Sequence, residues 1–109
     1  MARQAIETRA LGKSGIQVTR MGIGLWAVGG DEWGPTDDRD SLEAIEAALE
    51  AGITFFDTSA VYGDGHSEEL LGQAMKGRRD KFIVATKIGW RGFDGERRQS
   101  AYTTVEALI

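Results

Sequence analysis

The sequence predicts an α/β protein in which parallel strands alternate with helices after an N-terminal β-hairpin. Three apolar segments begin near residues 21, 53 and 82, about thirty residues apart, and the first two are each followed by a helical pattern. This spacing is typical of a strand, a helix and the return to a parallel neighbour. The 109 residues match the size of one domain. We therefore expect residues 1–109 to belong to a single domain.

The hairpin is predicted over residues 8–19. Gly12 and Gly15 surround its polar tip, and residues 16–18 alternate between apolar and polar side chains, as a half-buried strand does. The first parallel strand is predicted over residues 21–25. Its two glycines indicate that another group approaches the backbone closely.

Helices are predicted after the first two parallel strands. The first begins at Asp37, whose side chain can cap free amides, and it ends at Gly52. The second is expected to begin at Ser67, as the N-cap, and to continue to Gly77. The pattern of residues 100–109 indicates the beginning of a third helix.

The second and third parallel strands are predicted over residues 53–57 and 82–87. Both runs are almost continuously apolar, which is typical of strands covered on both faces. Parallel strands end at the same edge of a sheet, so the side chains that follow them should meet there. α/β proteins bind their ligands at this edge. The residues expected there are Leu25, Trp26, Asp57 and Lys87.

Composition and charge exclude several classes of function. Apolar residues make up 41% and charged residues 28% of the chain, and the net charge is −4, with basic residues only in small groups. Nucleic acids and anionic membranes are therefore not expected as partners. The chain has no cysteine, and its single histidine, His66, lacks the ligand spacing of a metal site and is expected in a solvated loop. With no signal-peptide pattern at the N-terminus, we expect a cytoplasmic protein.

The residues at the predicted sheet edge can form a proton-transfer site. Tyr62 follows Asp57 by five positions, but a free phenol has a pKa of about 10, too high for an effective acid near neutral pH. The cation of Lys87 beside the phenol would lower that pKa, and Asp57 would keep the lysine charged and oriented. A salt bridge between Asp57 and Lys87 that only ties two strand ends together is the simpler alternative.

These residues lie in motifs that resemble the N-terminal part of an aldo-keto reductase. The matching segments occur in the family's order and cover almost the whole chain. They are residues 11–15, 22–26, 29–30, 33–34, 52–53, 56–63, 65, 67–68, 71–72 and 85–87.

The resemblance implies a (β/α)8 TIM barrel, with the hairpin closing its bottom, that reduces an aldehyde or ketone to an alcohol with NADPH. Carried over by position, Tyr62 is the general acid and Lys87 lowers its pKa. Asp57 pairs with Lys87 and lies near the nicotinamide ribose. Leu25 and Trp26 would line the nicotinamide end of the cofactor site. Three tryptophans either form walls of the substrate pocket or pack loops: Trp26, Trp33 and Trp90.

The chain provides only part of such a barrel, which needs about 250 residues. The resemblance covers the hairpin and the first three strand–helix units, and the family's catalytic histidine follows the fourth strand. His66 cannot replace that residue, so the 109-residue piece alone is expected to be inactive. Two alternatives remain open. One is a non-catalytic domain that covers its open sheet by self-association or with a partner chain, and the other is a regulatory subunit resembling those of potassium channels.

Overall fold

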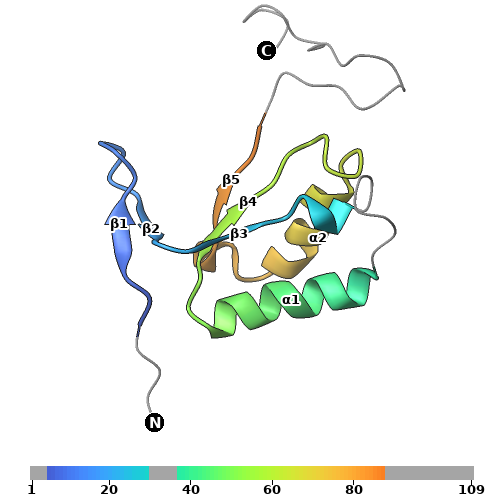
Figure 1. Cartoon of the computed structure of the whole chain (residues 1–109), viewed down its shortest axis with the longest axis horizontal. Helices are drawn as coiled ribbons and strands as arrows, with labels where there is room; N and C mark the ends of the chain where they lie inside the picture. The colour runs from blue at the N-terminus through green and yellow to red at the C-terminus, as the bar shows by residue number, and fades with distance from the viewer. Residues whose placement is uncertain (1–4, 30–36, 88–109) are drawn as a thin grey trace, which may run out of the picture.

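A hairpin, a parallel sheet and two helices make up the described part of the computed structural model, residues 5–29 and 37–87. In the hairpin, Thr8–Ala10 (β1) pairs antiparallel with Gln17–Thr19 (β2), so the predicted hairpin is confirmed. Gly12 and Gly15 both have positive φ angles at its tip, which glycine adopts without steric cost. Figure 1 shows the hairpin to one side of the sheet.

The sheet contains three parallel strands in sequence order. They are Gly22–Gly24 (β3), Phe55–Asp57 (β4) and Ile83–Ala85 (β5). The register aligns Gly24 with Asp57 and Asp57 with Ala85. All three strands therefore end level at one edge, as expected, although each is shorter than the apolar run that predicted it. Of the two glycines in β3, Gly22 has Phe55 where a Cβ would lie, whereas a Cβ added to Gly24 would meet nothing within 4 Å in the described residues.

The first α-helix, Asp38–Glu50 (α1), has the predicted ends. Asp37 accepts a hydrogen bond from the Arg39 amide at 2.8 Å and so caps the N-terminus. Gly52, with a φ of 96°, follows the last turn in the left-handed conformation. A short 3₁₀ turn, Ala27–Gly29 (η1), follows β3.

The second α-helix, His66–Met75 (α2), begins earlier than predicted. Its N-cap is Gly65, with a φ of 97°, and Ser67 lies inside the helix and is fully buried. The prediction of Ser67 as the cap is wrong, because the glycine turns the chain two residues sooner. A 3₁₀ turn, Arg79–Lys81 (η2), then leads into β5. Neither α-helix in the described residues combines the length and apolar character that crossing a membrane requires.

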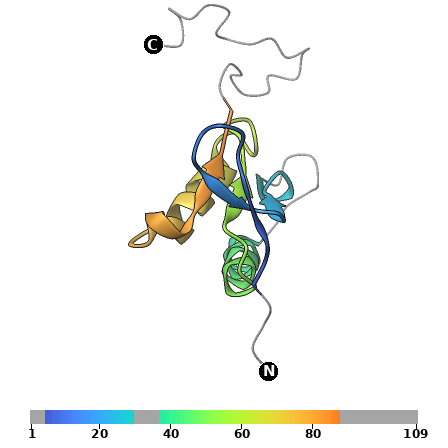
Figure 2. The ribbon, with the colours of Figure 1, turned by 90° about the vertical axis from the view of Figure 1, so that its left-hand side faces the viewer.

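The core lies between the sheet and the two helices. Phe56 of β4 is fully buried, and its ring lies 5.0 Å from that of Phe82. Figure 2 shows α1 and α2 from the direction in which the hairpin faces the viewer. The other members of this core come from α1, α2 and the strand ends: Leu25, Ile45, Ala48, Ile53 and Leu71.

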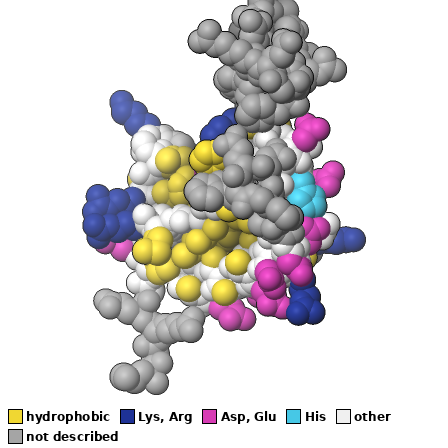
Figure 3. Space-filling model, turned by 45° about the vertical axis from the view of Figure 1, so that its right-hand side comes forward, with side chains coloured by type: hydrophobic (Ala, Val, Ile, Leu, Met, Phe, Trp, Pro, Cys, Tyr) yellow, Lys and Arg dark blue, Asp and Glu magenta, His cyan; other side chains and the backbone are white. Residues whose placement is uncertain are grey.

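The described residues bury only one face of β4 fully. Phe56 points into the core, whereas Phe55 and Asp57 on the other face are only partly buried. The prediction that β4 is covered on both faces is therefore not met in the described residues, where only Phe56 of this strand is fully buried. Exposed apolar side chains such as Met21 and Trp26 remain, and Figure 3 shows hydrophobic side chains gathered on the face turned toward the viewer.

Candidate active site

Lys87 contacts both of the other residues that the sequence predicted as a proton-transfer site. Its amine Nζ donates to the Asp57 carboxylate, with Oδ1 at 3.2 Å and Oδ2 at 3.3 Å. The same amine lies 3.2 Å from the Tyr62 hydroxyl oxygen and 2.9 Å from the main-chain oxygen of Thr58. The structure thus brings Asp57, Tyr62 and Lys87 together at the carboxyl edge of the sheet.

The site is open to solvent, which determines what its charges can do. The side chains of Lys87 and Asp57 are 48% and 47% exposed, so their ion pair contributes less than about 1 kcal/mol to stability. Desolvation by partial burial lowers the pKa of Lys87, but hydrogen bonds with Tyr62 and Asp57 raise it by more, and the net shift is upward. Lys87 therefore carries a full positive charge at neutral pH. The pair serves to place that charge beside the phenol.

A tight loop between β4 and α2 presents Tyr62. The Tyr62 amide donates to the Ser59 carbonyl at 3.1 Å, and Gly63 and Asp64 both have positive φ angles. The Lys87 amine also lies 4.9 Å from the centre of the Tyr62 ring. Tyr62 thus meets the cation with its ring as well as its hydroxyl group.

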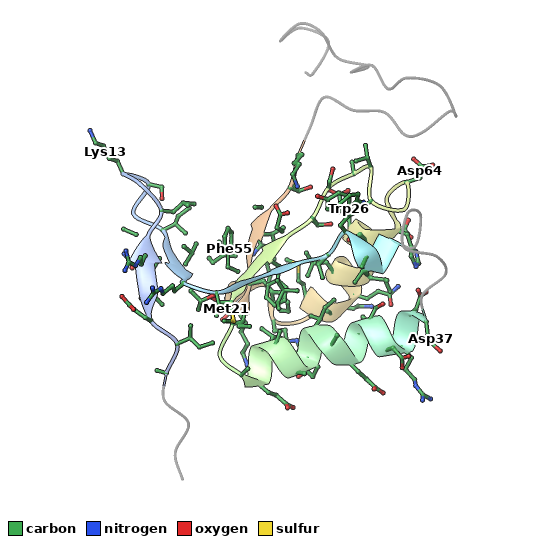
Figure 4. All side chains as sticks on the ribbon, viewed as in Figure 1. Lys13, Met21, Trp26, Asp37, Phe55 and Asp64 are labelled. Carbon is green, nitrogen blue, oxygen red and sulfur yellow. The ribbon has the colours of Figure 1, made fainter. Side chains whose placement is uncertain are left out.

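Trp26 lies beside Tyr62 at the same edge. Their ring centres are 6.2 Å apart with planes inclined by 25°, and the tryptophan side chain is 45% exposed. Figure 4 shows Trp26 beyond the end of β3, close to the loop that carries Asp64 and far from Met21 at the other end. The indole therefore offers a flat apolar surface next to the phenol.

The other predicted binding residues have different positions. The Leu25 side chain is 1% exposed and belongs to the core, so only its main chain reaches the site, where its amide donates to the Asp57 carbonyl at 2.9 Å. Trp33 and Trp90, which were predicted to line a substrate pocket, lie outside the described residues.

A buried pair of hydroxyl groups supports the site and was missed by the sequence analysis. Ser67 Oγ donates to the Leu25 carbonyl at 2.9 Å and lies 2.9 Å from Thr58 Oγ1. Ser67 and Thr58 are at most 1% exposed. Through these bonds α2 is tied to the ends of β3 and β4. The signal in the sequence was that two small hydroxyl residues, Thr58 and Ser67, lie on either side of the loop that carries Tyr62.

His66 is not the solvated loop residue that the sequence predicted. It is the first residue of α2, and its Nε2 lies 2.7 Å from Asp38 Oδ1. The histidine therefore joins the N-terminal ends of the two helices.

This fold and these contacts define a class of α/β protein in which a charged lysine is placed against a tyrosine at the carboxyl edge of a parallel sheet. Residues 20–107 match the model of the aldo/keto reductase family. The chain belongs to this family.

Individual relatives agree with that assignment. The chain is 47% identical over 90 residues to aldo-keto reductase YhdN of Bacillus subtilis, a match that covers 79% of this chain and 27% of the relative. Its structure matches aldo-keto reductase AKR11C1 of Bacillus halodurans, in holo form, with a TM-score of 0.73 and 33% identity over 86% of this chain and 30% of that one. It also matches an aldo-keto reductase of Klebsiella pneumoniae in complex with NADPH, with a TM-score of 0.60 and 27% identity over 81% of this chain and 28% of that one.

The likeness in structure supports the (β/α)8 barrel expected from the sequence, of which the described residues contain the hairpin and a three-stranded section with open sheet edges. The chain spans less than a third of the length of each of these relatives.

Proposed function

We propose that this chain supplies the tyrosine, lysine and aspartate of an enzyme that reduces an aldehyde or ketone to an alcohol with NADPH. The observation that carries the proposal is the position of the Lys87 amine, within 3.3 Å of both the Tyr62 hydroxyl and the Asp57 carboxylate. A salt bridge that only tied two strand ends together would not require a tyrosine hydroxyl on the same amine. Family membership supports the same chemistry.

Tyr62 is the proton donor in this mechanism. As the carbonyl carbon of the substrate accepts a hydride, its oxygen gains negative charge and takes the proton of the Tyr62 hydroxyl. The phenolate that remains is stabilised by the Lys87 ammonium, 3.2 Å away. Asp57 and the Thr58 carbonyl hold that ammonium in place. Because the lysine side chain is half exposed, water can reach the site and restore the proton after each turnover.

The described residues fit the nicotinamide end of the proposed cofactor. The Asp57 carboxylate keeps half of its side chain surface free, so it can accept a hydrogen bond from a ribose hydroxyl. The exposed indole of Trp26 can pack against a flat heterocycle beside Tyr62. When bound, NADPH would supply the hydride. Use of NADPH rather than NADH is supported by the Klebsiella relative that was solved with NADPH.

The test compares Tyr62→Phe with Tyr102→Phe, which removes a hydroxyl from the only other tyrosine of the chain. Both variants are made in a protein that carries this chain and reduces a test aldehyde. We expect Tyr62→Phe to retain NADPH binding and to lose at least about 10²-fold in kcat, because the general acid is gone. Tyr102→Phe should retain kcat. If Tyr62→Phe turned over at the unaltered rate, the proposed role of this site would be excluded.

A further inference from the structure

The turn η1 packs directly against the backbone of Tyr62, the residue proposed as the general acid. A Cβ atom added to Gly29 would lie 2.5 Å from the Gly63 nitrogen and 2.6 Å from the Tyr62 carbonyl carbon. The contact is mutual, because a Cβ on Gly63 would lie 2.3 Å from the Gly29 oxygen. Main chain touches main chain here, with no room for a side chain on either residue.

The same segment contacts Tyr62 a second time through its ring. Trp26 immediately precedes η1 and stacks on the Tyr62 ring at 6.2 Å. The Gly29 amide donates to the Trp26 carbonyl at 3.1 Å, which holds the two contact points together. The tyrosine hydroxyl also meets the Lys87 amine. Tyr62 therefore contacts both the segment that ends in η1 and the cation.

We propose that Gly29 is a positioning residue, whose lack of a side chain sets how closely the Tyr62 hydroxyl approaches the Lys87 amine. The inference rests on the proposed function for its effect on turnover, but the geometry that it describes can be measured without turnover. Ordinary contacts of a Cβ atom begin near 3.4 Å, so an alanine at position 29 requires η1 and the backbone of Tyr62 and Gly63 to move apart by about 1 Å. A misplacement of this size can reduce a rate about 10²-fold.

The test is Gly29→Ala in the full chain, with Gly72→Ala as the matched control, because a Cβ at position 72 meets nothing within 4 Å in the described residues. Nuclear magnetic resonance titration of the Lys87 amine reports on the contact. The hydrogen bond with Tyr62 raises the pKa of Lys87, so Gly29→Ala should lower that pKa in the direction of Tyr62→Phe. Gly72→Ala should leave it unchanged.

Two results would overturn the inference. One is a folded Gly29→Ala variant that keeps the Lys87 pKa of the unaltered chain while Tyr62→Phe lowers it. If Gly29→Ala does not fold, the second test uses the unaltered chain. A nuclear Overhauser effect between the Gly29 α protons and the Gly63 amide proton supports the close backbone contact on which the inference rests. The absence of this effect excludes the contact and the inference with it.

Turnover separates this inference from the proposed function. Gly29→Ala should reduce kcat about 10²-fold with little change in the dissociation constant for NADPH. Normal turnover of Tyr62→Phe would reject the catalytic role alone, and the Lys87 titration would still decide whether Gly29 positions the tyrosine.

Discussion

Ser67 and Leu25, 42 residues apart in the sequence, are joined by a 2.9 Å hydrogen bond from the serine hydroxyl to the leucine carbonyl. The bond is fully buried and fixes the N-terminal end of α2 to the end of β3. Thr58 Oγ1 extends the same network to the end of β4. Two hydroxyl groups therefore hold three segments of the chain behind the candidate site.

Replacing Ser67 with alanine should destabilise the fold by about 1–3 kcal/mol, because the buried Leu25 carbonyl then lacks its hydroxyl donor. Denaturation with urea measures the change. Ser14→Ala is the control, since its two hydrogen bonds lie in the exposed hairpin turn, and it should cost clearly less. Equal losses in the free energy of unfolding would show that the buried hydrogen bonds of Ser67 stabilise the fold no more than the exposed ones of Ser14.

The Lys87 contacts should stabilise the fold only while the amine is charged. The pKa of Lys87 is raised above its ordinary value of 10.5. Its contribution is therefore fully present below pH 10.5 and is lost as the pH rises through the higher pKa of the folded state. We expect the stability difference between the unaltered chain and Lys87→Met to be below about 1 kcal/mol at neutral pH, because the pair is half exposed.

Urea denaturation of both proteins at increasing pH measures this difference. It should shrink toward high pH, and a difference that grew in alkaline solution would contradict the assignment of the charge. Lys81→Met serves as a control for the loss of a lysine elsewhere in the chain.

The ion pair between Glu46 and Arg78 predicts the opposite dependence on pH. Arg78 Nη1 donates to Glu46 Oε1 at 3.1 Å, and its guanidinium carbon lies 5.8 Å from the centre of the Phe82 ring. The hydrogen bond with Arg78 lowers the pKa of Glu46 below 4.5. The stabilisation is thus present above pH 4.5 and is lost as the pH falls through the lower pKa of the folded state.

Glu46→Gln should therefore lower the thermal midpoint at neutral pH, with a smaller effect in acid. Glu43→Gln removes an exposed carboxylate from the same helix. In the unaltered chain, Glu43 Oε1 lies 3.7 Å from Arg39 Nε. It should change the midpoint less at neutral pH. An equal response of the two variants would mean that the contact with Arg78 adds nothing.

Phe56 and Phe55 test which face of β4 is covered. Phe56 is fully buried, and its replacement by alanine should cost about 3–5 kcal/mol. Phe55 on the opposite face is only partly buried, so Phe55→Ala should cost clearly less when the free energy of unfolding is measured. A cost for Phe55→Ala as large as that for Phe56→Ala would reveal that something covers the second face in solution.

The order of elements and the meeting of Asp57 and Lys87 could be predicted from the sequence, because both follow from local patterns. A period of strand and helix gives parallel strands, and parallel strands end at one edge. Asp37 and Gly52 likewise mark the ends of α1 through their own backbone chemistry.

Contacts between segments could not be predicted in this way. Serine is a residue type that often caps helices, so Ser67 was predicted as the cap. Because the left-handed Gly65 is the cap instead, the Ser67 hydroxyl can donate to the Leu25 carbonyl. The close approach of Gly29 to Gly63 left no local signal either, since many glycines in this chain simply form turns. Burial of the Leu25 side chain depends on how β3 is rotated against the helices, which an apolar strand does not specify.

The parallel register has a consequence for the time at which the site forms. The chain between Gly24 and its neighbour Asp57 contains α1, and the chain between Asp57 and its neighbour Ala85 contains α2. Each pairing closes a loop of about thirty residues before it gains any contact, so it carries a loss of chain entropy that a hairpin avoids. During synthesis, the Tyr62 hydroxyl can gain its cation only once residue 87 has left the ribosome. The candidate site can therefore form only when all three strands of this part of the sheet have been synthesised.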